Sequence, residues 1–158
     1  MLNLLIGSIV FACIGVFVIY SSNLIISKQH QTVLQYFSNN NVLILQDVKT
    51  ETFGSGTKNS NFYFNRCTLI ATDEALIILG RLNLFKKLCT PIILTNNFLL
   101  YRSKFPFANI MKPNKTNLHS FNQDVYIEFE NHGPMKTTID LRVKGLTDEV
   151  KSKLYFLI

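Results

Sequence analysis

The feature that most constrains the fold of this chain is an apolar run near its N-terminus. Residues 4–26 read LLIGSIVFACIGVFVIYSSNLII, and the first charged side chain in the sequence is Lys28. A helix rises about 1.5 Å per residue, so about 20 helical residues cross a hydrocarbon core of about 30 Å. The run therefore predicts a single-pass transmembrane anchor over residues 1–27.

A cleaved signal peptide is the main alternative for this segment. Such a peptide has a basic start, a shorter apolar run and a small-x-small cleavage site. Residues 1–3 contain no Lys or Arg, and residues 20–22 (YSS) are a poor cleavage site, which favours an uncleaved anchor. Because basic residues mark the cytoplasmic side and Lys28 follows the run, we expect a cell-membrane protein whose C-terminal domain faces the cytoplasm.

Charge is confined to the rest of the chain. All 16 basic and 10 acidic residues lie after residue 27, which gives this part the full net charge of +6. Residues 28–158 are enough for one domain with its own core. A positive surface suits anionic lipid head groups. Nucleic acid is not an expected partner, because no basic run exceeds residues 86–87 and no aromatic motif interrupts one.

Residues 28–41 (KQHQTVLQYFSNNN) have the pattern of an amphipathic helix. Val33, Leu34 and Phe37 share one face, and Gln and His fill much of the remainder. We expect a helical linker that continues the anchor and holds the following domain off the bilayer. His30 should be exposed to solvent on this helix.

Strand signals begin at residue 42 and predict a β domain over residues 42–158. In residues 67–80 (CTLIATDEALIILG), two apolar runs flank the polar step 72–74 (TDE). A helix beginning at Thr72 would have only about two turns, and short isolated helices are marginal. A hairpin with residues 72–74 in its turn is therefore favoured.

A second hairpin is predicted from residues 91–94 and 98–101, with residues 95–97 (TNN) as its turn. After it, a polar connection containing Pro106 and Pro113 runs to about Asn122.

The most regular hairpin lies near the C-terminus. Residues 124–130 (DVYIEFE) alternate between apolar and polar side chains, and residues 136–143 pair with them across the turn at 131–134. A slip of one residue would bury the glutamates, so the register is well specified.

The final segment predicts a helix. Thr147 is a plausible N-cap with acidic residues at 148 and 149, and Val150, Leu154 and Leu157 form an apolar stripe. The expected fold is mainly β, with about seven short strands and this terminal helix behind the transmembrane helix.

The hairpin LIATDEALIIL, together with a closing hairpin followed by residues 145–146 (GL) and an amphipathic helix, resembles the pleckstrin-homology (PH) superfold, which includes GRAM and bacterial PH-like domains. The resemblance covers about residues 42–158. It implies a bent seven-stranded barrel or sandwich closed by the C-terminal α-helix, and a binding role without catalytic residues.

Catalytic, metal and cofactor sites are not predicted, so we do not expect an enzyme. The three histidines are scattered and lack neighbouring ligands at metal-binding spacing. Cys67 and Cys89 are expected to be inert buried thiols. Residues 54–58 (GSGTK) lack the spacing of a phosphate-binding loop.

A set of basic residues in or beside loops is the remaining candidate site. It could contact lipid head groups or an acidic partner, although ordinary solubilising charge is the favoured explanation. Its members are Lys86, Lys87, Arg102, Lys104, Lys112 and Lys115.

Two functional hypotheses follow. The first is a membrane-anchored, non-enzymatic PH-like module that contacts a protein partner or anionic lipid head groups. The second is a small accessory subunit of a membrane complex, whose transmembrane helix is the main interaction element. The spacing of Ser8 and Ala12 permits close helix packing and hence a homo-oligomer.

Overall fold

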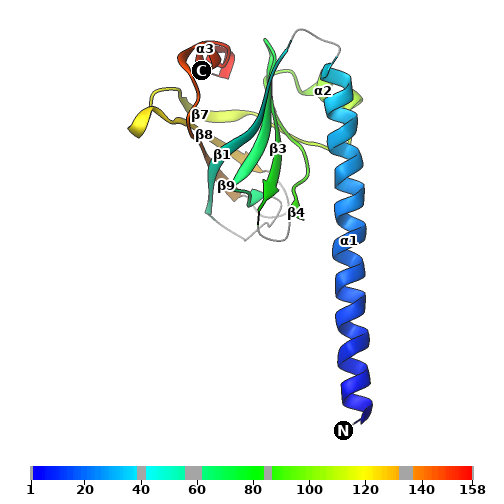
Figure 1. Ribbon diagram of the computed structural model, residues 1–158. Coiled ribbons are helices and arrows are strands. Elements are labelled where there is room, and N and C mark those ends of the chain that lie inside the picture. The colour runs from blue at the N-terminus through cyan, green and yellow to red at the C-terminus, as the bar shows by residue number, and fades with distance from the viewer. Residues whose placement is uncertain (1, 39–41, 56–61, 84–86, 132–136, 158) are drawn as a thin grey trace.

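The computed structural model describes residues 2–38, 42–55, 62–83, 87–131 and 137–157, with side chains from Cys13 onward. A long helix, α1 (Leu2–Ser38), lies beside a barrel-like β domain (Figure 1). The domain also contains α2 (Phe98–Lys104), α3 (Asp148–Ser152) and the 3₁₀ turns η3 (Phe121–Gln123) and η4 (Tyr155–Leu157). Its strands are β1 (Leu43–Ser55), β2 (Arg66–Ala71), β3 (Ala75–Leu82), β4 (Lys87–Leu88), β5 (Ile92–Thr95), β6 (Asn109–Met111), β7 (Pro113–Asn117), β8 (Val125–Asn131) and β9 (Thr137–Val143).

The strands form one curled sheet in the order β6-β5-β3-β2-β1-β9-β8-β7, with β4 paired to β3. Strand β1 joins the two halves of the sheet, β6-β5-β3-β2 and β9-β8-β7. Its first part pairs with β2, and its residues 50–55 pair with β9. The register shifts between Leu45 and Val48, where Asp47 has a φ of 57°. Such a bulge bends the strand and lets it serve both halves.

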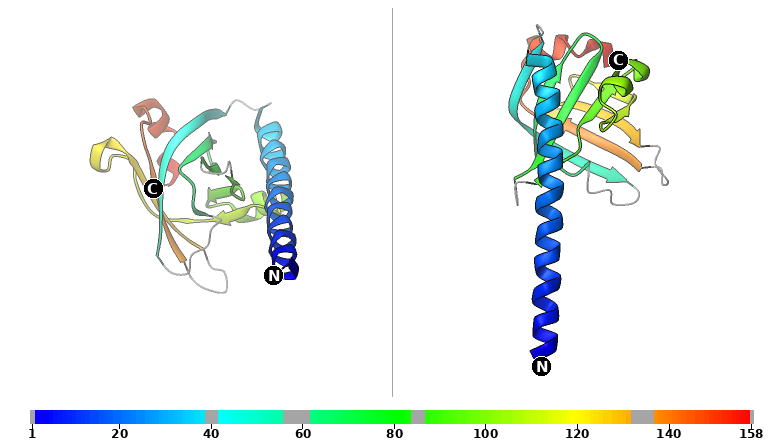
Figure 2. Two further views of the ribbon diagram at one scale, coloured as in Figure 1. Left: turned by 60° about the horizontal axis from the view of Figure 1, so that its bottom comes forward. Right: turned by 90° about the vertical axis from the view of Figure 1, so that its right-hand side faces the viewer.

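The two ends of the sheet are joined by the chain itself. Strand β6 pairs in parallel with β5, and β7, one residue later, pairs antiparallel with β8. Lys112 alone separates β6 from β7, so the sheet curls into a nearly closed barrel (Figure 2).

The predicted hairpin at residues 67–80 is confirmed by β2 and β3. The backbone N–H of Thr72 donates to the carbonyl of Ala75 at 3.0 Å, and Thr72 Oγ1 accepts from the N–H of Ala75 at 2.9 Å. Gly80 allows close packing here, because a Cβ at this position would lie 2.7 Å from the ring of Phe64.

The hairpin of β8 and β9 is also confirmed. Val125 pairs with Val143 and Phe129 with Ile139, and all four side chains are buried. The predicted turn residues 132–134 lie outside the described part of the chain.

The position of β3 between two apolar clusters explains why its sequence is apolar without alternation. Leu76 and Ile78 belong to the cluster inside the barrel, while Ile77 and Leu79 belong to a second cluster on the outer face of the sheet. A strand buried on both faces reads as a continuous apolar run. The second cluster also contains residues of α1 and α2.

Helix α1 confirms that residues 28–38 are helical, but this part is not a free linker. Val33 and Phe37 are buried, and the ring centroids of Phe37 and Phe105 are 6.0 Å apart. The C-terminal half of α1 therefore packs along the outside of the barrel, whereas its N-terminal half extends beyond the domain (Figures 1 and 2).

The prediction of a transmembrane anchor is wrong. In the part of the chain that the structure describes, no helix has an apolar stretch long enough to cross a bilayer. One physical reason is that Asn23, inside the predicted span, bonds to the β domain: its Oδ1 accepts from the N–H of Leu88 at 3.2 Å.

The predicted second hairpin is wrong as well. Residues 98–104 form α2 instead of a strand, because the side chain of Asn97 caps the helix by accepting from the N–H of Leu100. The predicted polar connection contains β6 and β7, which are both short, and β7 is mostly polar. The described sheet therefore has nine strands where about seven were expected.

The C-terminal helix begins where predicted but is shorter than predicted, because α3 ends at Ser152 and the 3₁₀ turn η4 follows it. Thr147 occupies the N-cap position of α3, although its side chain makes no capping hydrogen bond. Val150, Leu154 and Leu157 all pack into the cluster inside the barrel. The hydroxyl of Thr116 donates to the carbonyl of Leu157 at 3.0 Å, which fixes this end to β7.

Candidate interaction surfaces

The first candidate surface is the apolar part of α1 at residues 13–20, which we call the bare segment. Every residue in it is exposed, and Val16 and Phe17 keep 68% and 69% of their surface accessible. The segment covers more than two helical turns, so all faces of the helix are exposed. Burying a large apolar side chain is favourable by about 1.5–3 kcal/mol. The bare segment therefore favours a state in which it is covered.

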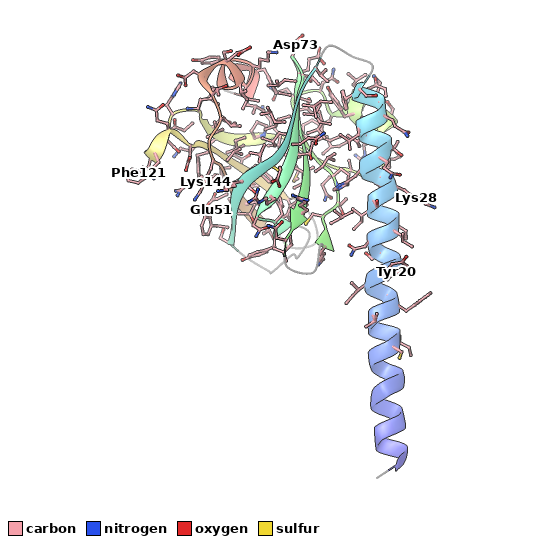
Figure 3. All side chains as sticks on the ribbon, in the orientation of Figure 1. Tyr20, Lys28, Glu51, Asp73, Phe121 and Lys144 are labelled. Carbon is pink, nitrogen blue, oxygen red and sulfur yellow. The ribbon has the colours of Figure 1, made fainter. Side chains whose placement is uncertain are left out.

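Docking of α1 on the domain begins just after this segment. In Figure 3, Tyr20 lies near the level at which α1 leaves the β domain, and Lys28 lies on the part of α1 that runs alongside the domain. In addition to the bond from Leu88 to Asn23, Nε2 of His30 donates to the carbonyl of Cys89 at 2.7 Å.

His30 is thus half-buried, and the prediction that it is solvated is wrong. Burial lowers its pKa, an effect partly offset by the hydrogen bond to Cys89. The neutral imidazole, with the proton on Nε2, satisfies the carbonyl of Cys89.

The predicted basic residues do not form one continuous surface. Lys87 lies on β4, well apart from α2 in Figure 1, and Lys86 lies outside the described residues. Lys115 is exposed on β7, and Lys104 is exposed on α2.

Two of the predicted residues, Arg102 and Lys112, line the same groove. This seam groove, of about 580 Å³, lies where the barrel is not closed by hydrogen bonds, between α2, β6 and the ends of β7 and β8. It combines apolar walls with cationic, amide and carboxylate groups. Its lining residues are Phe98, Arg102, Pro106, Ala108, Asn109, Ile110, Met111, Lys112, Asn114, Glu130 and Asn131.

A smaller hollow of about 290 Å³ involves α2, the end of α1 and the β2–β3 turn. Here Lys104 donates to the hydroxyl of Tyr36 at 2.5 Å and lies 5.0 Å from the centroid of its ring. Lys104 therefore stabilises the contact between α1 and α2 in this structure. Asp73 and Glu74 also line this hollow.

Several other cations of the domain are paired with carboxylates. Asp47, at the bulge of β1, bonds to Arg66 at 2.6 Å and also to Arg81. Glu51 pairs with Lys144, which lies beside it in Figure 3. The hydrogen bond from Lys144 lowers the pKa of Glu51.

The buried thiols match their prediction. Cys67 and Cys89 are free and buried, and burial raises the pKa of Cys67 to about 12 and that of Cys89 to about 11. Both are thiols, not thiolates, at neutral pH. Within the described residues, no three His, Cys, Asp or Glu side chains lie close enough to hold a metal ion.

One further exposed aromatic residue lies on a loop. Phe121 keeps 79% of its surface accessible and points outward in Figure 3. The next two residues, Asn122 and Gln123, each have a φ of 61°, a conformation that is unfavourable for residues other than glycine. The hydroxyl of Ser120 donates to the carbonyl of Asp124 at 2.8 Å and holds the loop.

Sequence reasoning missed several residues of these surfaces. Asn109 and Asn114 were part of an expected connection, and Glu130 was expected only as an outward residue of a strand. Their polar character was visible, but no local pattern indicates that they lie next to α2. The apolar character of the bare segment was clear, although it was assigned to a bilayer span.

Comparison of the chain with protein-family models, with curated proteins and with solved structures found no significant match. The resemblance to the PH superfold therefore stays a prediction.

Proposed function

We propose that this protein is a non-enzymatic interaction module that binds other proteins, and that the bare segment of α1 is its main contact element. The observation that supports this function is the exposure of every residue from 13 to 20 on a helix that extends beyond its domain. Such a segment gains free energy when a partner removes it from water.

The pattern of exposure favours a partner that supplies several helices. A helix that is apolar on all faces is normally buried among other apolar elements, whereas one partner helix would cover only one face. The chain then acts as a small accessory subunit, in which α1 inserts among the helices of the partner and the barrel remains outside as a cap.

The β domain has a defined role in this arrangement. The contacts of Asn23, His30, Val33 and Phe37 fix the direction in which α1 leaves the barrel. The partner therefore meets a helix that is already formed and oriented, which lowers the entropic cost of association.

The test is the state of the full chain isolated from its own cells under mild detergent. Wild-type protein should sediment as a complex larger than the 18.1 kDa chain. A double variant, Val16→Gln with Phe17→Gln, should sediment at the mass of the single chain, because two polar side chains on the bare segment oppose burial. Glutamine keeps a good helix propensity, so α1 itself should persist.

The matched control is Leu99→Gln. Leu99 is the most exposed large apolar residue of α2, at 84% accessible, and lies outside the bare segment. This variant should remain in the complex. Loss of the complex in both variants, or in neither, would contradict the proposal.

A second variant distinguishes specific helix packing from non-specific hydrophobic adhesion. Shuffling the order of residues 13–20 keeps their composition but changes the shape of the helix surface. We expect the shuffled chain to lose its partner. If it is retained, or binds vesicles of anionic lipid instead, the contact is unspecific apolar adhesion and the proposed function is wrong.

A further inference from the structure

We propose that the seam groove is a second binding site, which takes an acidic, extended segment of a partner protein as an added strand on β6. This site is independent of the bare segment of α1 and uses different residues.

The first argument is the free edge of β6. Among the described strands, this one is terminal in the sheet and pairs with β5 alone. The N–H of Asn109 donates to the carbonyl of Pro91 at 2.8 Å, on the side of β5. The N–H and C=O groups of successive strand residues point to alternate sides of the strand. Because those of Asn109 face β5, the N–H and C=O of Ile110 point away from β5. Ile110 lines the seam groove, so its backbone groups are on the groove side. A strand edge without a partner is a template for another strand.

The second argument is charge. Arg102 and Lys112 are exposed, and no carboxylate in the described part of the chain pairs with either of them. They reach the groove from two separate elements, α2 and the link between β6 and β7. The net charge of +6 also attracts an acidic partner over longer distances.

The third argument is the match between the groove and an extended peptide. Side chains of a strand alternate between two faces. One set can contact the apolar wall at Pro106, Ile110 and Met111, while acidic side chains of the other set contact the cations. Glu130 lines the side of the groove at β8, whereas the cation Arg102 lies on the side of α2. The acidic side chains therefore lie toward α2.

The experiment begins with displayed random peptides selected on the full chain. Selection should enrich peptides with acidic residues at alternate positions and β-branched residues between them. The leading peptide is then synthesised, and its affinity is measured by fluorescence anisotropy. Arg102→Glu and Lys112→Glu should each weaken binding about tenfold or more, because each places a like charge beside the peptide.

Lys115→Glu is the matched control. It makes the same change of charge on exposed β7, outside the groove lining, and should change affinity by about twofold or less. Val16→Gln with Phe17→Gln should also leave peptide binding intact, so failure of this site and failure of the proposed function are distinguishable.

Methylation of the peptide backbone tests strand addition. Methyl groups on one alternating set of peptide nitrogens should abolish binding, and methyl groups on the other set should not, because only one set bonds to β6. The proposal is overturned if acidic peptides are not enriched. It is also overturned if the leading peptide binds both charge-reversal variants as tightly as wild type, or if the two methylated sets behave alike.

Discussion

The two halves of α1 both carry large apolar side chains, but these side chains have opposite surroundings. The docked half is the part of α1 from Asn23 to Ser38, where Val33 and Phe37 keep 0% and 4% of their surface accessible. In the bare segment, Val16 and Phe17 keep 68% and 69% of their surface accessible. Both halves belong to one continuous helix. The two halves differ in whether a surface of the β domain lies opposite them.

Opposite the docked half, the outer face of the sheet presents apolar side chains, among them Ile77 and Leu79. Polar contacts from Asn23 and His30 to the chain at Leu88 and Cys89 fix the position of the helix. The barrel ends before it reaches the bare segment (Figure 1). A helix alone does not determine whether its apolar residues are core or contact surface, because that depends on the neighbouring surface.

The largest expected effect comes from truncating the same residue type in each half. Phe37→Ala should lower the free energy of unfolding by about 3–5 kcal/mol, because it leaves a cavity between α1 and the barrel. Phe17→Ala should change it by less than about 0.5 kcal/mol, since this ring contacts mainly solvent. Urea unfolding of the full chain, followed by circular dichroism, measures both values. Similar losses in the two variants would show that the halves do not differ.

A smaller effect is expected where docking begins. Asn23→Ala removes the acceptor for the N–H of Leu88 and should cost about 1–3 kcal/mol. Ser22→Ala, at the exposed neighbouring position, should be nearly neutral. Hydrogen exchange at the amide of Leu88 provides the local measurement, and it should accelerate in the first variant only. Unchanged exchange in Asn23→Ala would mean that this bond does not hold the helix.

The contact of His30 should make docking dependent on pH. Its pKa in the folded state lies below the unfolded value of about 6.5, so the unfolded state binds the proton more strongly. The contribution of His30 is present above pH 6.5 or so and is lost as pH falls toward the folded pKa. The free energy of unfolding, measured across this range, should decline in wild type.

His30→Gln provides the control for this titration. Its amide can still donate to the carbonyl of Cys89 but does not titrate. The decline just below about pH 6.5 should therefore be reduced, while the loss at lower pH from Glu51, whose pKa is lowered, should remain. Identical pH profiles would exclude a role for His30.

The smallest expected effect is at the end of the docked half. Lys104→Met removes the hydrogen bond to Tyr36 and the cation over its ring, at a cost of about 0.5–1 kcal/mol. Arg102→Met, on the same helix but in the seam groove, should leave stability unchanged. Thermal unfolding compares the two, and equal shifts of Tm would contradict the assigned contact.

Several parts of the fold could be predicted because their signals are local. Alternation over residues 124–130 and 136–143 identified the last hairpin, and the polar step at residues 72–74 identified the first. The stripe of Val150, Leu154 and Leu157 identified residues that pack into the barrel. Each pattern needs only neighbours in sequence, since periodicity reveals which face is buried.

The parts that were missed depend on distant partners. Strand β7 reads PNKTN and has no alternation of apolar residues, so only its pairing with β8 makes it a strand. Residues 98–101 are apolar enough for a strand, and the cap from Asn97 together with burial of Tyr101 favours the helix. For the same reason, no sequence pattern brings Arg102 and Lys112 to one groove.

The amino-acid order by itself determined the regular hairpins, the burial of both domain thiols and the helical character of residues 28–38. Tertiary structure decided that these helical residues dock on the barrel, that residues 13–20 remain uncovered, and that two distant cations line the open seam. The physical reason is that backbone periodicity is set by nearby residues. Which surface covers a side chain depends on residues that only the folded chain brings close.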